Sequence, residues 1–172
     1  FSVVFMAFVT LGTVIYLETK SDSENSSSKQ AELDAVEWEK KYKKYEDYQQ
    51  PRIVAVKADV DIYPKKRTYK ASAVYTMVNK TDEAIDSVFV NHNSLENTFE
   101  FNKSSTLVLE DTIFNFDIFK FENAIQPGDS LQLTIQVKSE ENSTFRQKSS
   151  IIENGTFINN SSMFPSLGYS SQ

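Results

Sequence analysis

The sequence predicts a mainly β fold after residue 50, an antiparallel β-sandwich or an open barrel. Seven or eight segments of alternating apolar and polar residues follow one another there, separated by turn residues. No helical pattern intervenes between them, which argues against parallel β-α-β units. Thirteen phenylalanines and eight tyrosines against four glycines indicate an aromatic core.

Length and composition limit what the chain can be. The 172 residues leave room for one domain of about 100 to 150 residues and an appendage. The net charge of -6 argues against nucleic acid as a partner, because a basic surface is needed for the phosphates. The chain has no cysteine, which excludes disulfides and thiolate zinc sites.

Residues 1–17, FSVVFMAFVTLGTVIYL, carry no charge. A bilayer crossing needs roughly 20 apolar residues, and we expect this run to be the C-terminal part of a truncated transmembrane helix. A signal peptide would need a basic start and a cleavage site, and neither is present. A buried core helix is the remaining alternative. No basic cluster follows the run, so we expect membrane attachment with the later domain on the extracytoplasmic, periplasmic side.

The next two segments connect this run to the β-rich part. Residues 18–30 are polar and rich in serine, which predicts a flexible linker. Residues 31–49 predict a helix, because acidic residues precede basic ones in the order that suits the helix dipole. Its apolar stripe could be a docking face, could pack on the chain's own domain, or could belong to a solvated spacer. The stripe consists of Ala31, Ala35, Trp38, Tyr42 and Tyr45.

The β domain is expected over residues 50–172, incomplete at its C-terminal end, and residues 52–80 give its clearest pattern. They predict two strands joined by the turn 63–67, where Pro64 fixes the backbone. Period-two alternation predicts that the first strand is half-buried. Its expected inner face consists of Val54, Val56, Ala58, Val60 and Ile62.

Shorter strand patterns follow the hairpin. The turn at 126–129, QPGD, separates two of them. The expected strands lie at 84–91, 98–101, 106–109, 114–121, 131–137 and 150–158.

The residues themselves predict no catalytic, cofactor or metal site. His92 is the only histidine, and a lone histidine after a strand usually lies on the surface or in a turn. The carboxylate pairs 110–111 and 140–141 fall in predicted turns, where solvation keeps acids from acting as an acid/base pair. Seven Asn-x-Ser/Thr matches, including Asn79, could accept glycans in a eukaryotic secreted protein. Such matches also arise readily by chance in a chain rich in Asn and Ser.

Several motifs, taken in order, resemble one known family. They are VDIYP at 60–64, YTMVNKT at 75–81, IDSV at 85–88, PGDSL at 127–131, NGTFINNSS at 154–162 and FPSLGY at 164–169. Residues 40–172 are similar to the N-terminal β domain of M1-family (gluzincin) zinc aminopeptidases. The similarity is greatest to the bacterial version that is fused behind a multi-spanning ABC-2-type permease.

This resemblance implies a saddle-like antiparallel β-sandwich that precedes a catalytic domain. In that family a His-Glu-x-x-His helix with a distant Glu holds zinc, and a Gly-x-Met-Glu-Asn loop grips the peptide's amino terminus. None of these motifs occurs in the 172 residues, so no catalytic residue is carried over and zinc is implied only for the domain that would follow. The family's Phe-Pro-Cys-x-Asp turn reads FPSLG at 164–168, which fits the permease-fused branch and leaves open whether the parent protein is an active peptidase.

Two functions follow as hypotheses. The first is a non-catalytic, membrane-tethered β domain that caps the catalytic domain of an M1-like metallopeptidase, with the loops 91–97 and 154–162 contributing to the cleft for a peptide substrate. The alternative is a tethered binding module without enzymatic activity, which would recognise its partner through loops or an edge strand. A cap domain should expose an apolar patch where its catalytic domain belongs.

Overall fold

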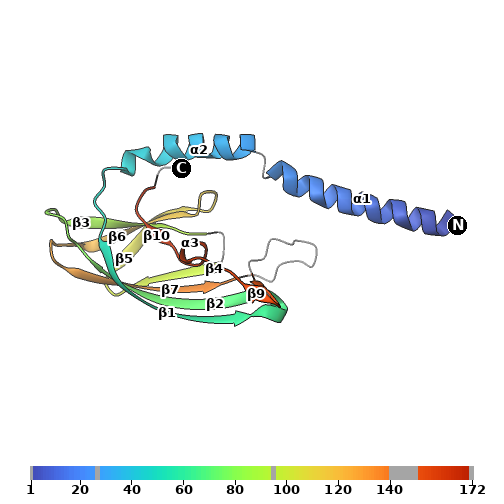
Figure 1. Cartoon of the computed structure of the whole chain (residues 1–172). Helices are drawn as coiled ribbons and strands as arrows, with labels where there is room; N and C mark the ends of the chain where they lie inside the picture. The colour runs from blue at the N-terminus through green and yellow to red at the C-terminus, as the bar shows by residue number, and fades with distance from the viewer. Residues whose placement is uncertain (1, 26–27, 94–95, 140–150, 171–172) are drawn as a thin grey trace. The chain divides into compact units, whose positions relative to one another are not determined.

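A computed structural model describes residues 2–25, 28–93, 96–139 and 151–170 of the chain (Figure 1). Two compact units are present. The helical unit lies before Tyr45, and the β unit is Tyr45–Ser170. The β unit therefore begins a few residues earlier than the predicted domain boundary at residue 50.

The helical unit contains α1 (Ser2–Asn25) and α2 (Ser28–Tyr42), followed by the single 3-10 turn η1 (Lys43–Tyr45). The prediction of a linker without regular structure at 18–30 is wrong for the described residues 18–25 and 28–30, which are helical. Glu and Lys within 18–25 favour a helix, whereas the serine, threonine, asparagine and aspartate residues there favour it less. The second helix ends well before residue 49. Among the described residues, no helix has both the length and the apolarity that crossing a membrane requires.

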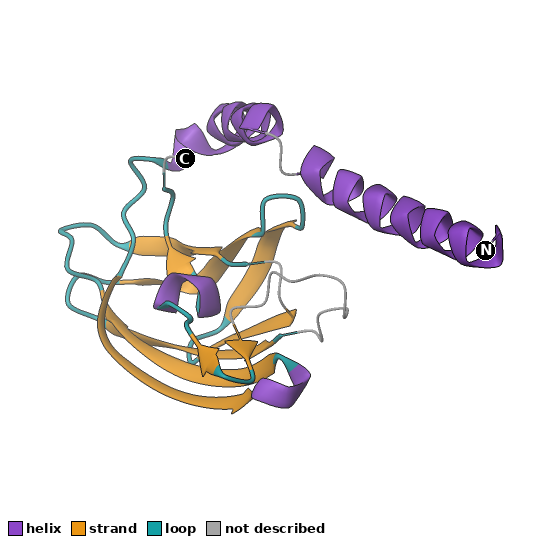
Figure 2. Ribbon diagram, turned by 45° about the vertical axis from the view of Figure 1, so that its right-hand side comes forward, coloured by secondary structure: helices purple, strands orange, loops and turns teal. Residues whose placement is uncertain are grey.

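The β unit is an antiparallel β-sandwich, as the alternation predicted (Figure 2). Sheet A has the strand order β1-β2-β7-β4, and sheet B has the order β10-β3-β6-β5. The longer strands are β1 (Arg52–Tyr63), β2 (Thr68–Val78), β3 (Ile85–Asn91), β4 (Glu96–Phe101), β5 (Ser105–Asp111), β6 (Phe116–Ile125) and β7 (Ser130–Lys138).

The hairpin β1-β2 has the predicted extent and turn. The turn contains η2 (Pro64–Lys66), and Arg67 closes it with a positive φ of 54°. Strand β2 alternates as expected, with Tyr69, Ala71, Ala73, Tyr75 and Met77 buried. Because β7 pairs with β2 along its length and buries Leu131, Leu133, Ile135 and Val137, these two central strands form one wall of the core.

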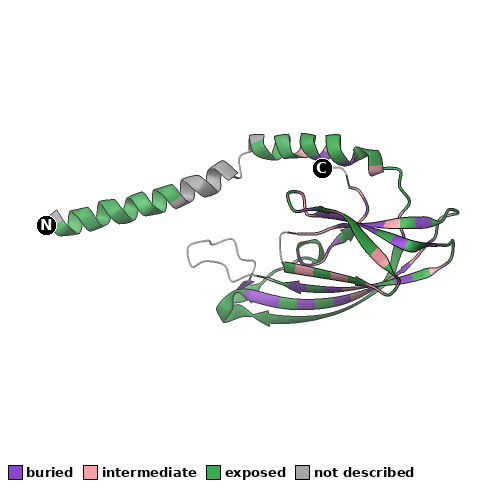
Figure 3. Ribbon diagram, turned by 180° about the vertical axis from the view of Figure 1, so that it is seen from behind, coloured by how far each residue is buried: buried purple, intermediate pink, exposed green. Residues whose placement is uncertain are grey.

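Strand β1 differs from its prediction in two ways. The register against β2 shifts between Ile53 and Ala55, so Ile53 and not Val54 lies opposite the buried Met77. All twelve residues of β1 are exposed, so the prediction of a half-buried strand is wrong. Figure 3 shows exposed residues in green along this outer strand of sheet A. Alternation assigned the side chains to a face, but no described element of the β unit buries that face at β1.

Sheet B closes the core from the other side. Phe119 and Phe121 of β6 contact the β4 ring of Phe101, each at a centroid distance of 5.1 Å. Phe89 and Phe116 lie in a second aromatic cluster, where Tyr45 contacts Phe89 at 5.0 Å. Strand β6 is consequently buried at four successive residues, 116–119, and does not alternate there.

The C-terminal part was predicted only in outline. A single strand at 150–158 was expected; Ser150 lies outside the described residues, and the rest forms a small hairpin of β8 (Ile151–Ile152) and β9 (Gly155–Thr156). The sequence analysis missed the short helix α3 (Asn160–Met163) and β10 (Ser166–Leu167), which pairs with β3. Two-residue strands carry too few side chains for a periodic pattern to be visible.

Candidate functional site

The two loops expected to contribute to binding meet at one end of the sandwich. The side-chain amide of Asn93 donates to the main-chain oxygen of Ser162 at 2.7 Å. Asn159 caps α3, and its Oδ1 accepts from the Ser162 main-chain N–H at 2.8 Å. Residues 94 and 95 of the first loop lie outside the described residues. The hydrogen bond from Asn93 joins segments 69 positions apart in sequence into one surface.

His92 lies beneath this surface, where the chain leaves sheet B for sheet A. Its main-chain N–H donates to the oxygen of Asn115, at 2.9 Å, in the turn between β5 and β6. The imidazole Nε2 lies 3.5 Å from Oδ2 of Asp117, and the two side chains are only 16% and 9% exposed. Asp117 is on β6, which pairs with β3 immediately before His92. The histidine side chain is thus largely buried beside a carboxylate, with which it forms an ion pair when protonated, and the expectation of an ordinary surface or turn residue understated its environment.

The hydrogen bonds around the ring determine its tautomer. Nδ1 lies 2.7 Å from the main-chain oxygen of Asn93, which can only accept, so Nδ1 carries a proton. The side-chain amide of Asn97 lies 3.3 Å from the same nitrogen and therefore cannot donate to it. Asn97 instead donates to the main-chain oxygen of Asn93, at 3.2 Å. Because Asn97 is the second residue of β4, this small network links the sheet B crossover to sheet A.

The charges around His92 favour its protonated form. Burial lowers the pKa of His92, but hydrogen bonds to Asp117 and the Asn93 carbonyl, with the charges of Asp117 and Glu110, raise it above its ordinary value overall. Glu110 lies opposite Asp117 in the β5-β6 register. Oδ1 of Asp117 is buried and has no hydrogen-bond partner among the described residues. A charged imidazolium offsets part of the cost of burying this carboxylate.

This geometry suits an electrostatic link better than catalysis. Both ring nitrogens of His92 already face partners, so neither is directed to a substrate proton. In the part of the chain that the structure describes, no three His, Cys, Asp or Glu side chains come together as a metal site. The structure therefore gives His92 a role in holding the crossover in place.

The carboxylate pairs of the sequence analysis have different outcomes. Glu110 and Asp111 end strand β5 and do not lie in a turn, although Glu110 is exposed to solvent as expected. Asp111 is buried, and its Oδ1 accepts from the main-chain N–H groups of Ile113 and Phe114, at 2.9 and 3.1 Å. It stabilises the following turn. The pair 140–141 lies outside the described residues.

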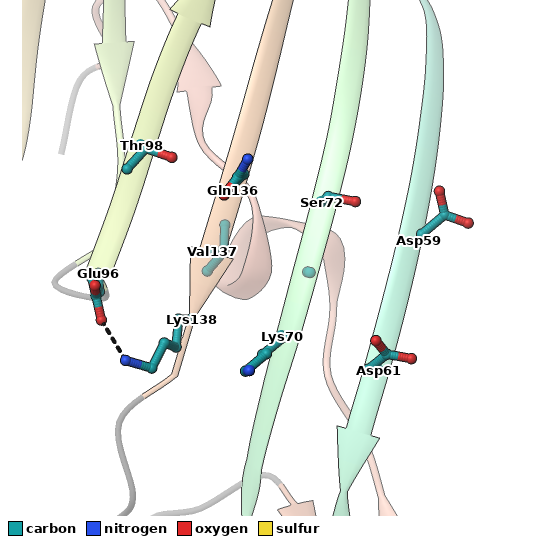
Figure 4. A pocket seen from close by; sticks show the side chains of 10 residues that line it. Asp59, Asp61, Lys70, Ser72, Glu96, Thr98, Gln136, Val137 and Lys138 are labelled. Carbon is teal, nitrogen blue, oxygen red and sulfur yellow. Dashed lines mark hydrogen bonds and ion pairs between the residues drawn. The ribbon is translucent and has the colours of Figure 1, made fainter.

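A shallow polar groove crosses the outer face of sheet A (Figure 4). Its side chains form two rows across the four strands, with one residue from each strand in each row. The first row consists of Asp61, Lys70, Lys138 and Glu96. The second row consists of Asp59, Ser72, Gln136 and Thr98. Lys138 forms an ion pair with Glu96 at 3.0 Å, whereas Asp59, Asp61 and Lys70 have no recorded partner among the described residues. All eight side chains are exposed, so the groove is a solvated face with mixed charge.

The inner face of β1 is the second unusual surface. Val56, Val60 and Ile62 lie opposite Tyr75, Ala71 and Tyr69, which are all buried. The three β1 side chains are nevertheless 54%, 40% and 43% exposed. The apolar row of Ile53, Val56, Ala58, Val60 and Ile62, hereafter the β1 row, therefore extends the core face of sheet A beyond what sheet B covers.

Sequence comparisons add no relative: no protein-family model matches the chain, and no curated protein matches it significantly. The function must therefore be argued from these surfaces. The sequence analysis missed the partnership of His92 with Asp117, although a signal was present. Asp117 is an acidic residue inside the aromatic run FNFDIFKF at 114–121, where a buried charge needs a partner.

Proposed function

We propose that the β unit is the non-catalytic N-terminal domain of a membrane-bound, M1-like zinc metallopeptidase and that it packs against the catalytic domain. The observation that supports this is the exposed β1 row. Its side chains continue the core face of sheet A, as expected of a domain whose partner surface belongs to a following domain. In this proposal residues 1–17 belong to the membrane anchor, and zinc and the peptide substrate bind in the catalytic domain.

The coding sequence after Gln172 is the most direct test. A His-Glu-x-x-His motif in the following few hundred codons would support the proposal. A stop codon or another β-sandwich at that place would overturn it. The purified chain with added zinc should show no aminopeptidase turnover, and metal-dependent turnover would also contradict the assignment of catalysis to another domain.

Substitutions in the full-length protein test the surface itself. Replacing Val56 and Val60 by serine should loosen the contact with the catalytic domain and increase its cleavage in limited proteolysis. Val108→Ser is the matched control, because Val108 on β5 is also a valine that is 54% exposed. Equal protease sensitivity of the two variants would show that the β1 row does not carry the contact.

A binding module without enzymatic activity is the second candidate. The hydrogen bond between Asn93 and Ser162 favours it, because it holds two loops together in the way a recognition surface requires. In this case the full-length protein would lack the zinc motif, and substitutions in the β1 row would leave partner binding unchanged.

A further inference from the structure

The main-chain edge of β1 is a separate feature from its inner face. β1 is the terminal strand of sheet A, and only β2 pairs with it in the described chain. In Figure 4, Asp59 and Asp61 lie on this last strand. Exposed edges are usually protected by proline, by charged side chains, by β-bulges or by covering elements. Strand β1 has a bulge or irregularity between Ile53 and Ala55, and its charges lie on its outer face. From Ala55 to Ile62 the strand has no proline and no inward charge, so it offers a regular edge for another strand.

The charges on the outer face of β1 can pair with opposite charges on the same strand of a second, antiparallel copy. Lys57, Asp59 and Asp61 alternate with the β1 row and share one face of the sheet. If a second copy pairs antiparallel with Ala58 opposite Ala58, each Lys57 lies opposite Asp59 of the second copy. In the same register each Val56 lies opposite Val60 of the second copy. Opposite charges and β-branched pairs at such positions both stabilise an antiparallel pair.

Other registers are less favourable. A shift of two residues in one direction keeps two opposite-charge pairs, Lys57 with Asp61 of the second copy, but adds a like-charge pair, Asp59 opposite Asp59. A shift in the other direction places Lys57 opposite Lys57. Like charges directly opposite each other destabilise the pair. A shift of one residue would turn the apolar row of one copy toward the polar face of the other.

We propose that β1 pairs with β1 of a second copy of this chain, antiparallel, with Ala58 at the two-fold axis. The pairing joins the two A sheets into one continuous sheet and aligns the two β1 rows on one face. It goes beyond the proposed function because it uses the main-chain edge, whereas packing against a catalytic domain uses the inner face. Each can fail without the other.

A single introduced cysteine tests this arrangement in the full chain, which has none of its own. Opposite residues of an antiparallel pair have Cα atoms about 4.5 to 5.5 Å apart, which suits a disulfide. Ala58→Cys should therefore give a disulfide-linked dimer on mild oxidation. Ala58 is exposed, so thermal unfolding followed by circular dichroism should show an unchanged fold.

Two cysteine variants are matched controls. Val60 and Leu107 are 40% and 42% exposed, the first on β1 and the second on the edge strand of sheet B. In the proposed register the two Val60 residues are separated by about 13 Å, so Val60→Cys and Leu107→Cys should cross-link at most about a tenth as fast as Ala58→Cys. Equal rates in all three would indicate random collision, or association through α1, and would overturn the proposal.

A charge exchange tests the register in the Ala58→Cys background. Lys57→Asp should slow cross-linking about tenfold, because it places like charges opposite each other. Adding Asp59→Lys should restore the rate, and Lys120→Asp on β6 should leave it within about twofold. No rescue by the double exchange would overturn the proposal. Faster cross-linking of Asp59→Cys than of Ala58→Cys would also overturn it, because the axis would then lie at Asp59.

Discussion

The two edges of sheet A contrast sharply. β4 is six residues long, and its inner side chains Phe99 and Phe101 pack against the core. β1 is twice as long and carries an equally apolar inner row, yet every residue is exposed. The difference lies in what faces them. Phe119 and Phe121 of sheet B contact the inner rings of β4, whereas the described part of the β unit places nothing over β1 that buries its row.

This contrast shows that an apolar row is not by itself part of a core. The free energy gained by an apolar side chain depends on the area removed from water. On β4 that area is covered within the β unit, so its phenylalanines contribute to folding. On β1 much of it is still available, so its valines and isoleucines can contribute to association.

The largest expected effect compares these inner rows directly. Phe101→Ala should lower the free energy of unfolding by about 2 to 3 kcal/mol, because it leaves a cavity against Phe119 and Phe121. Val60→Ala should cost less than about 0.5 kcal/mol, because its side chain is already partly hydrated. Urea unfolding of both variants measures the difference. Similar losses would mean that the β1 row is buried in solution by another element.

The second prediction concerns the contacts of His92 with Asp117 and Asn93, which together with Asn97 link β4, but not β1, to sheet B. The pKa of His92 is raised in the folded chain, so the stabilisation from its pairing with Asp117 is full below the unfolded-state pKa. As the pH rises above the unfolded-state pKa of about 6.5, this stabilisation decreases. It is lost once the pH has passed the higher pKa of His92 in the folded chain. His92→Gln should therefore destabilise the chain more at low pH than at high pH.

Chemical unfolding across this pH range, for the unsubstituted chain and His92→Gln, measures that difference. Asp117→Asn serves as a second variant, because it removes the carboxylate that favours the imidazolium. The stability of both variants should vary less than that of the unsubstituted chain across this pH interval. A parallel pH dependence in all three proteins would show that His92 and Asp117 do not interact in solution.

The smallest expected effect is on the outer face of β4. Glu96 and Lys138 form an exposed ion pair at 3.0 Å, with side chains 63% and 59% exposed. Glu96→Gln should change the free energy of unfolding by less than about 0.5 kcal/mol. Added salt should reduce even this effect, because exposed charges are screened. A larger loss that salt does not reduce would indicate that this edge is less hydrated than β1.

Much of the β unit could be predicted because its signals are local. Alternation in β2 and β7 gave the buried residues, and Pro64 and Gly128 marked the turns; Gly128 has a φ of 85°. The Ile53–Ala55 irregularity could not be predicted, since it depends on how β1 is aligned with β2. The polar segment at 18–30 was also misassigned where it is described, because composition alone does not distinguish a linker from a polar helix.

The candidate site shows the same limit. The loops 91–97 and 154–162 were selected separately from their sequences, and the hydrogen bond between Asn93 and Ser162 brings them together. The partnership of His92 with Asp117 depends on the β3-β6 register, which aligns residues about 25 positions apart. A sequence contains such a pair only as two separate residues.

The sequence by itself determined the hairpin, the alternation and the side chains that share each face, because backbone geometry and side-chain period are local properties. Only the tertiary structure decided which apolar rows are covered in the described β unit, which strands lie at the sheet edges, and that the lone histidine meets a buried carboxylate. Those outcomes depend on how far sheet B extends over sheet A, and no single strand encodes that extent. The β1 row is apolar by sequence and exposed by tertiary arrangement, and the proposals for this protein follow from that combination.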